Sequence, residues 1–75
     1  MDPQAAWDQM LRAFACEEWS DVHEYATALS AWLDRRGFPP KVIINPSVGD
    51  PFNSALALSA CEFALARAAE NGWPP

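Results

Sequence analysis

The sequence is poor in basic residues, which excludes one large class of partners. Five lysines and arginines stand against ten aspartates and glutamates, so the net charge is −5 over 75 residues. Proteins that bind nucleic acids contact phosphates through a basic face, and anionic membranes attract the same kind of face. Here only Arg35 and Arg36 are adjacent basic residues. We therefore expect no nucleic acid and no membrane among the partners.

A long hydrophobic run is also missing. A helix that crosses a bilayer needs about 20 apolar residues in succession, whereas the richest segment, 55–69, contains Glu62 and Arg67. The first four residues have neither the positive charge nor the apolar core of a secretory signal. These observations predict a cytoplasmic protein.

Histidine, cysteine and glycine are too few and too scattered for the common catalytic and metal sites. His23, Cys16 and Cys61 show none of the short spacings of zinc ligands, and the three glycines are too far apart for a phosphate-binding loop. The carboxylates within 17–24 are typical of helix capping. We expect no catalytic residue, no metal and no cofactor, and predict that the protein is not an enzyme. Both cysteines are expected to be small buried apolar residues and not partners in a disulfide.

What the sequence does contain is the pattern of three helices. Asp2 followed by Pro3 is typical of a helix start, and the apolar spacing that follows predicts a helix over about 3–16. Asp21 as a cap and Gly37 as a stop predict a second helix over 21–36. An alanine-rich stretch, capped by Asn53 or Ser54, predicts a third over 54–71.

Apolar residues at helical spacing indicate which side of each helix forms the core. The third helix carries a second apolar side, roughly 100° or more from its main stripe. We expect this second side to be covered either by the other two helices together or by another copy of the chain. The main stripes are Trp7, Met10, Leu11 and Phe14 in the first helix, Val22, Ala26, Leu29 and Leu33 in the second, and Ala57, Cys61, Ala64, Leu65 and Ala68 in the third.

The segment 38–52 is expected to be irregular because it contains four prolines. It includes the β-favouring run Val42-Ile43-Ile44. This run forms either coil packed under the loop or a strand that pairs with the same segment of a second chain.

Two near copies of one motif, Gly37-Phe38-Pro39-Pro40 and Gly72-Trp73-Pro74-Pro75, stand thirty-five residues apart. That period is typical of helical repeats. The helices before the two motifs, however, share only one identity in this alignment, Ala31 with Ala66. We favour the interpretation that both motifs are helix stops with the aromatic ring folded back on the helix, and an internal repeat is the alternative.

Residues 7–40 resemble a single tetratricopeptide-type helical hairpin, in which aromatic, large and small residues stand at set spacings on two antiparallel helices. Leu11 and Leu29 occupy positions where that family has small residues. The resemblance implies hairpin packing and the binding of a peptide or protein partner, and it implies no reaction. The positions that carry it are Trp7, Met10, Leu11, Phe14, Trp19, Val22, Ala26, Leu29 and either Pro39 or Pro40.

Together these patterns predict one all-α domain over 1–75, an antiparallel hairpin plus a third alanine-rich helix joined by a long Pro-rich connection. Three short helices bury only part of four Trp, four Phe and one Tyr, so we expect a non-catalytic protein-interaction or adaptor module that self-associates. The alternatives are a monomeric regulator that binds one protein through an aromatic edge, or a small-ligand binder. The predicted partner-binding residues are Trp32, Val42, Ile43, Ile44, Leu56, Phe63 and Trp73.

Overall fold

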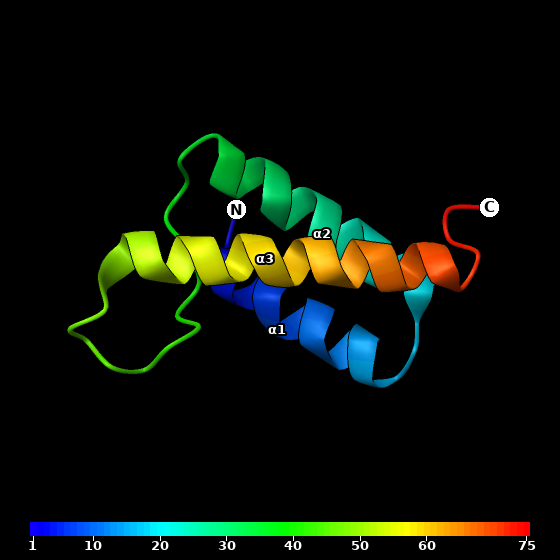
Figure 1. The fold of residues 1–75 in the computed structure, drawn as a ribbon, viewed down its shortest axis with the longest axis horizontal. Coiled ribbons are helices and arrows are strands. Elements are labelled where there is room, and N and C mark those ends of the chain that lie inside the picture. Colours follow the sequence, from blue (N-terminus) through cyan, green and yellow to red (C-terminus); the bar gives the residue numbers. More distant parts are fainter.

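The computed structural model describes all 75 residues and contains three helices and no strand. These are α1 (Pro3–Ala15), α2 (Trp19–Asp34) and α3 (Gly49–Glu70), as Figure 1 shows. The predicted all-α class is therefore confirmed. Asp2 caps α1 as expected, because its Oδ1 accepts a hydrogen bond from the Ala5 backbone N–H at 3.1 Å.

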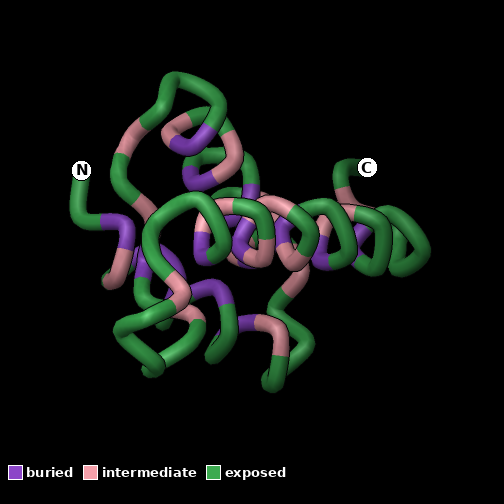
Figure 2. Tube along the Cα trace, turned by 60° about the vertical axis from the view of Figure 1, so that its left-hand side comes forward, coloured by how far each residue is buried: buried purple, intermediate pink, exposed green.

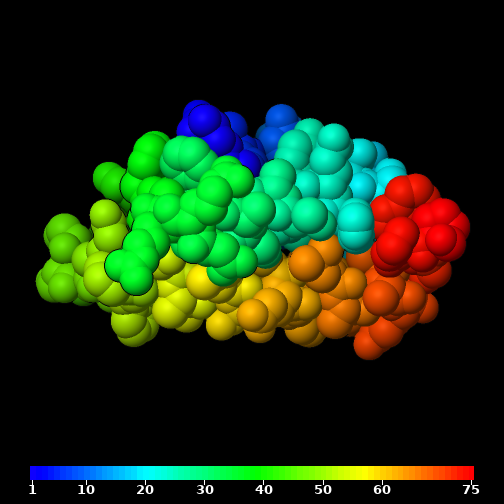
Figure 3. All heavy atoms as spheres, turned by 90° about the horizontal axis from the view of Figure 1, so that it is seen from above, coloured from blue at the N-terminus to red at the C-terminus, as the bar shows by residue number.

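The second helix occupies the middle of the arrangement. α1 and α2 form an antiparallel hairpin, and α3 then runs in the same general direction as α1 (Figure 1). α2 packs against both other helices, whereas α1 and α3 approach each other at few points. Seen from above, α2 lies between α1 and α3 (Figure 3). Consequently α1 and α3 leave a face between them that α2 does not cover.

The core lies where the three helices meet, and Figure 2 shows the buried residues gathered there. The predicted stripe of α2 is buried, with Val22, Ala26 and Leu29 fully so. α3 contributes mainly small side chains, which let its backbone come close to α2. The core cluster consists of Trp7, Met10, Ala13, Val22, Ala26, Leu29, Leu33, Ala57, Cys61, Ala64 and Ala68.

All three helices end in the same closure. In each, a residue in the left-handed region follows the cap, and the next N–H bonds back to a carbonyl five residues earlier, as in the Schellman motif. The left-handed residues are Glu17 at φ 57°, Arg36 at φ 63° and Gly72 at φ 84°. The closing bonds are each 2.9 Å long and join Glu18 to Ala13, Gly37 to Trp32 and Trp73 to Ala68.

The prediction that Gly37 provides the left-handed stop of α2 is wrong, because Arg36 adopts that conformation. Gly37 is required for a different reason. A Cβ atom at this position would lie 2.2 Å from Cε2 of the Trp32 indole. That ring lies over Gly37, and its Nε1 donates a hydrogen bond to the Phe38 carbonyl at 2.9 Å. The Trp32 indole thus packs against the first Gly-aromatic-Pro-Pro motif.

The second helix starts at Trp19, earlier than the predicted Asp21. Its cap residue is Glu18, whose side chain makes no capping hydrogen bond. The left-handed Glu17 and the closing Glu18–Ala13 bond reverse the chain within two residues, so helical backbone resumes at once. The first two helices also end earlier than predicted, at Ala15 and Asp34.

The third helix starts at Gly49, so the prediction of an irregular 38–52 and a start at residue 54 is wrong. Pro51 occupies the first turn of α3, where a backbone N–H has no partner within the helix and a proline causes no loss. The irregular connection is therefore 35–48. Asn53 is an interior residue of α3, and α3 ends at Glu70 instead of the predicted residue 71.

Asn53 fastens the connection to α3. Its Oδ1 accepts hydrogen bonds from the backbone N–H groups of Val42 and Ile43 at 3.0 and 2.8 Å. Its Nδ2 donates to the Gly49 carbonyl at 3.1 Å. These bonds satisfy backbone groups that a strand would otherwise pair, so the run Val42-Ile43-Ile44 is irregular in the structure.

Candidate functional site

An apolar groove lies between α1 and α3, on the face that α2 leaves uncovered. It encloses about 190 Å³ and is lined by apolar side chains alone. The buried residues Met10 and Ala64 belong to its lining. The remaining lining residues are Leu11 and Phe14 from α1, and Ala60 and Phe63 from α3.

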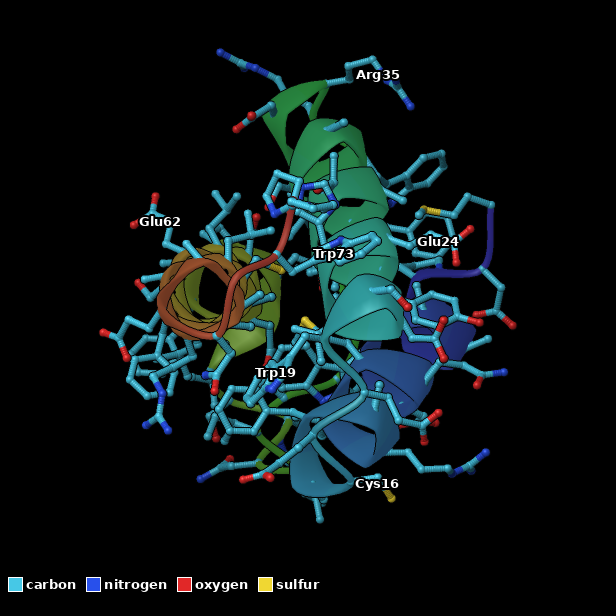
Figure 4. All side chains as sticks on the ribbon, turned by 90° about the vertical axis from the view of Figure 1, so that its right-hand side faces the viewer. Cys16, Trp19, Glu24, Arg35, Glu62 and Trp73 are labelled. Carbon is cyan, nitrogen blue, oxygen red and sulfur yellow. The ribbon has the colours of Figure 1, made fainter.

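Aromatic rings define one end of this groove. The Phe14 ring lies 5.8 Å from Phe63 across the groove and 5.5 Å from Trp19, edge to face with the latter. Figure 4 shows Trp19 on the side of the molecule where α1 and α3 face each other. Ring pairs at this separation attract one another beyond simple burial, and the three rings hold the groove's shape.

The groove is exposed because α1 and α3 each have an apolar side that is only partly covered by neighbouring helices. Leu11 is 46% exposed and Phe63 is 57% exposed. The prediction that the whole stripe of α1 belongs to the core is therefore wrong for Leu11, and Phe14 is only half-buried. α1 has one close neighbour, so only Trp7, Met10 and the small residues beside them are enclosed.

The predicted partner-binding residues do not form one surface. Trp32, Val42 and Trp73 are half-buried and pack against the core. Trp32 stacks edge to face on Phe38, with ring centroids 5.5 Å apart. Trp73 lies against the helices at the C-terminal end of α3 (Figure 4). These two tryptophans and the valine therefore complete the core of the chain.

The other four predicted residues lie in two places. Ile43 and Ile44 belong to the connection before α3, where Ile44 is 93% exposed. Leu56 is half-buried on α3 and Phe63 lines the groove. Leu56, Ala60 and Phe63 are the second apolar side of α3 that the sequence shows, and only part of it is covered.

Sequence reasoning missed the α1 half of the groove. The spacing of α1 predicts core positions for Leu11 and Phe14, but it does not show how many helices cover that stripe. The available signal was the width of the pattern. Met10 and Leu11 lie on opposite sides of Trp7 on the helix surface, so the stripe is wide and a single neighbouring helix leaves part of it uncovered.

The cysteines are the side chains whose reactivity remains to be considered. Burial raises the pKa of the Cys61 thiol, the nearby Glu62 carboxylate acts in the same direction, and the Ser30 hydroxyl opposes them. The Cys61 Sγ donates to the Met10 Sδ at 3.9 Å. Cys16 is a free thiol at the C-terminal cap of α1, and it is exposed, so the prediction that both cysteines are buried is wrong for Cys16. No three His, Cys, Asp or Glu side chains are placed to hold a metal ion.

A second, larger hollow lies between the C-terminal end of α2 and the first turn of α3. It measures about 630 Å³ and is wide open. Its walls combine opposite charges from Arg36 and Asp50 with Phe38 and two prolines. Arg36 and Asp50 are both exposed to solvent.

Comparisons with protein-family models, with curated proteins and with solved structures found no match to this chain. None of the three helices combines the length and the apolar composition that crossing a membrane requires.

Proposed function

We propose that this chain is a small non-catalytic protein-interaction module that self-associates through the groove between α1 and α3. The observation that carries the proposal is the groove itself, an apolar surface beside two large exposed side chains, Leu11 and Phe63. Exposed apolar patches on small proteins mark sites where another molecule binds. Aromatic side chains such as Phe63 and Phe14 are frequent anchors of such interfaces.

Two further features support this proposal. The resemblance of residues 7–40 to a tetratricopeptide-type hairpin implies protein binding. The free thiols of Cys16 and Cys61 suit a reducing compartment, and we propose the cytoplasm as the place where the protein acts.

The test is sedimentation equilibrium over a concentration series. For the wild-type chain we expect the apparent mass to rise from 8.3 kDa toward twice that value. The variants Phe63→Gln and Leu11→Gln remove apolar contact from the groove while keeping good helix formers on exposed sites. We expect both variants to keep the monomer mass over the same concentrations.

Phe38→Gln is the matched control, because Phe38 is also an exposed phenylalanine, 61% accessible, and lies away from the groove beside Trp32. It should associate like the wild type. A wild-type chain that remains at 8.3 kDa up to about 1 mM overturns self-association. Loss of association in Phe38→Gln but not in Phe63→Gln overturns the groove and favours the aromatic edge of α2.

A further inference from the structure

We propose that the second copy docks on the groove by twofold symmetry, with charged residues at diagonally opposite corners of the groove pairing between the copies. This inference rests on the proposed function, since it assigns the geometry of the same surface. A twofold interface brings one patch against an identical patch, so the patch must complement itself. Both the apolar and the charged residues around the groove meet that requirement.

The apolar residues provide a projection and a hollow on one face. Phe63 is more than half exposed at the edge of the groove. The hollow of about 190 Å³ beside Leu11 and Ala60 accommodates one aromatic side chain. When two such faces meet, the Phe63 ring of each copy enters the hollow of the other.

Charged residues on α3 mark one corner. Arg67 and Glu70 follow Phe63 by four and seven residues, so all three lie along the same side of the helix. Arg67 and Glu70 form the only ion pair of the chain, with Nε and Oε2 3.4 Å apart and side chains 44% and 68% exposed. An exposed pair of this kind is weak, which leaves both groups available for a partner.

Charged residues beside α1 mark the opposite corner. Asp8 and Gln4 precede Leu11 by three and seven residues and lie toward the N-terminal end of the helix. The Gln4 Oε1 accepts a hydrogen bond from the Lys41 backbone N–H at 2.8 Å, which holds Lys41 at this end. Asp8 and Lys41 are exposed, and neither forms an ion pair within the chain.

These two corners match by charge. Because α1 and α3 run in the same general direction (Figure 1), the pair on α3 and the pair beside α1 lie diagonally across one face. A twofold axis perpendicular to this diagonal, lying in the face, brings each corner against the other corner of the second copy. Arg67 then faces Asp8 of the second copy, and Glu70 faces Lys41. Every contact occurs twice, and all four bring opposite charges together.

A charge exchange tests this geometry. Sedimentation equilibrium is measured at about 0.15 M salt, where charges more than about 8 Å apart are screened from each other. We expect Arg67→Glu alone and Asp8→Arg alone each to raise the dimer Kd about tenfold, because each change acts at two contacts. The double variant restores opposite charges, and its Kd should return to within about threefold of the wild-type value.

Arg35→Glu and Glu24→Arg are the controls, because they change the net charge equally at two exposed positions, the C-cap of α2 and α2 itself, that point away from the groove (Figure 4). Both should leave the Kd unchanged. A double variant that stays as weak as the single variants, or single variants that behave like the controls, overturns the twofold geometry. Loss of association in Phe63→Gln would still support the proposed function in that case, whereas a monomeric wild type overturns both.

Discussion

Two of the three helix stops use a residue that is poorly suited to its conformation. Glu17 and Arg36 adopt φ near +60°, which strains a side chain with a Cβ atom, whereas α3 uses Gly72 at the equivalent position. The sequence suggests that Gly37 stops α2, whereas in the structure Arg36 is the left-handed residue and the Trp32 indole occupies the space above Gly37. A glycine next to a predicted stop can thus be required for packing, a distinction that local sequence does not make.

Replacement of the strained Arg36 should stabilise the protein. We expect Arg36→Gly to raise the free energy of unfolding by about 0.5 to 1 kcal/mol, since relief of the left-handed strain exceeds the entropy that glycine adds to the unfolded chain. Urea denaturation followed by circular dichroism measures this change. Arg35→Gly, at φ −87°, has no strain to relieve and should give no gain. A loss of stability in Arg36→Gly would contradict this explanation of the helix stop.

The Cys61 thiol should make stability depend on pH. Burial raises the pKa of this thiol in the folded state, so the unfolded chain releases the proton first as the pH rises. The stabilising contribution is present below the ordinary pKa of a thiol and is lost as the pH rises through the folded value. In a Cys16→Ser background, we expect the free energy of unfolding to fall more steeply with alkaline pH than in the same background with Cys61→Ala. Equal slopes would contradict this account.

The start of α3 and the attachment of the connection 35–48 to α3 each depend on one side chain. Four prolines in 38–52 predict an irregular segment, and this prediction is wrong after residue 48 because Pro51 falls in a first turn. Asn53 looks like a helix cap in the sequence, whereas in the structure its side chain accepts hydrogen bonds from the backbone of the connection. Sequence spacing indicates that an asparagine near a helix start bonds to backbone, but not to which segment.

Removal of the Asn53 side chain should loosen the connection before α3. We expect Asn53→Ala to lower the free energy of unfolding by about 1 to 3 kcal/mol, because two part-buried N–H groups lose their acceptor. Hydrogen exchange at the amides of Val42 and Ile43 should accelerate. Asn53→Asp keeps the acceptor and should protect these amides better than alanine does. Unchanged exchange in the alanine variant would show that Asn53 does not hold the connection.

For the whole molecule, the sequence predicts the fold well and the candidate site only in part. Periodic stripes identify three helices and most of the core, because Val22, Ala26 and Leu29 on α2 are buried whatever the pose of the neighbours. The groove depends on the distance between α1 and α3, which periodicity does not encode. Phe63 is accordingly the one predicted partner-binding residue that lines it, while Trp32 and Trp73 turn out to complete the core.

The proposed association uses the α1–α3 face, with Lys41 at its corner, and no other surface of the chain. Amide NMR spectra recorded over a dilution series test this most directly, since each shift reports one position. We predict concentration-dependent shifts in 8–15 of α1, at Lys41 and in 56–70 of α3, with residues 32–38 at the end of α2 and just after it unchanged. Shifts confined to residues 32–38 or to Ile43 and Ile44, or no shifts at all, would overturn association through this face.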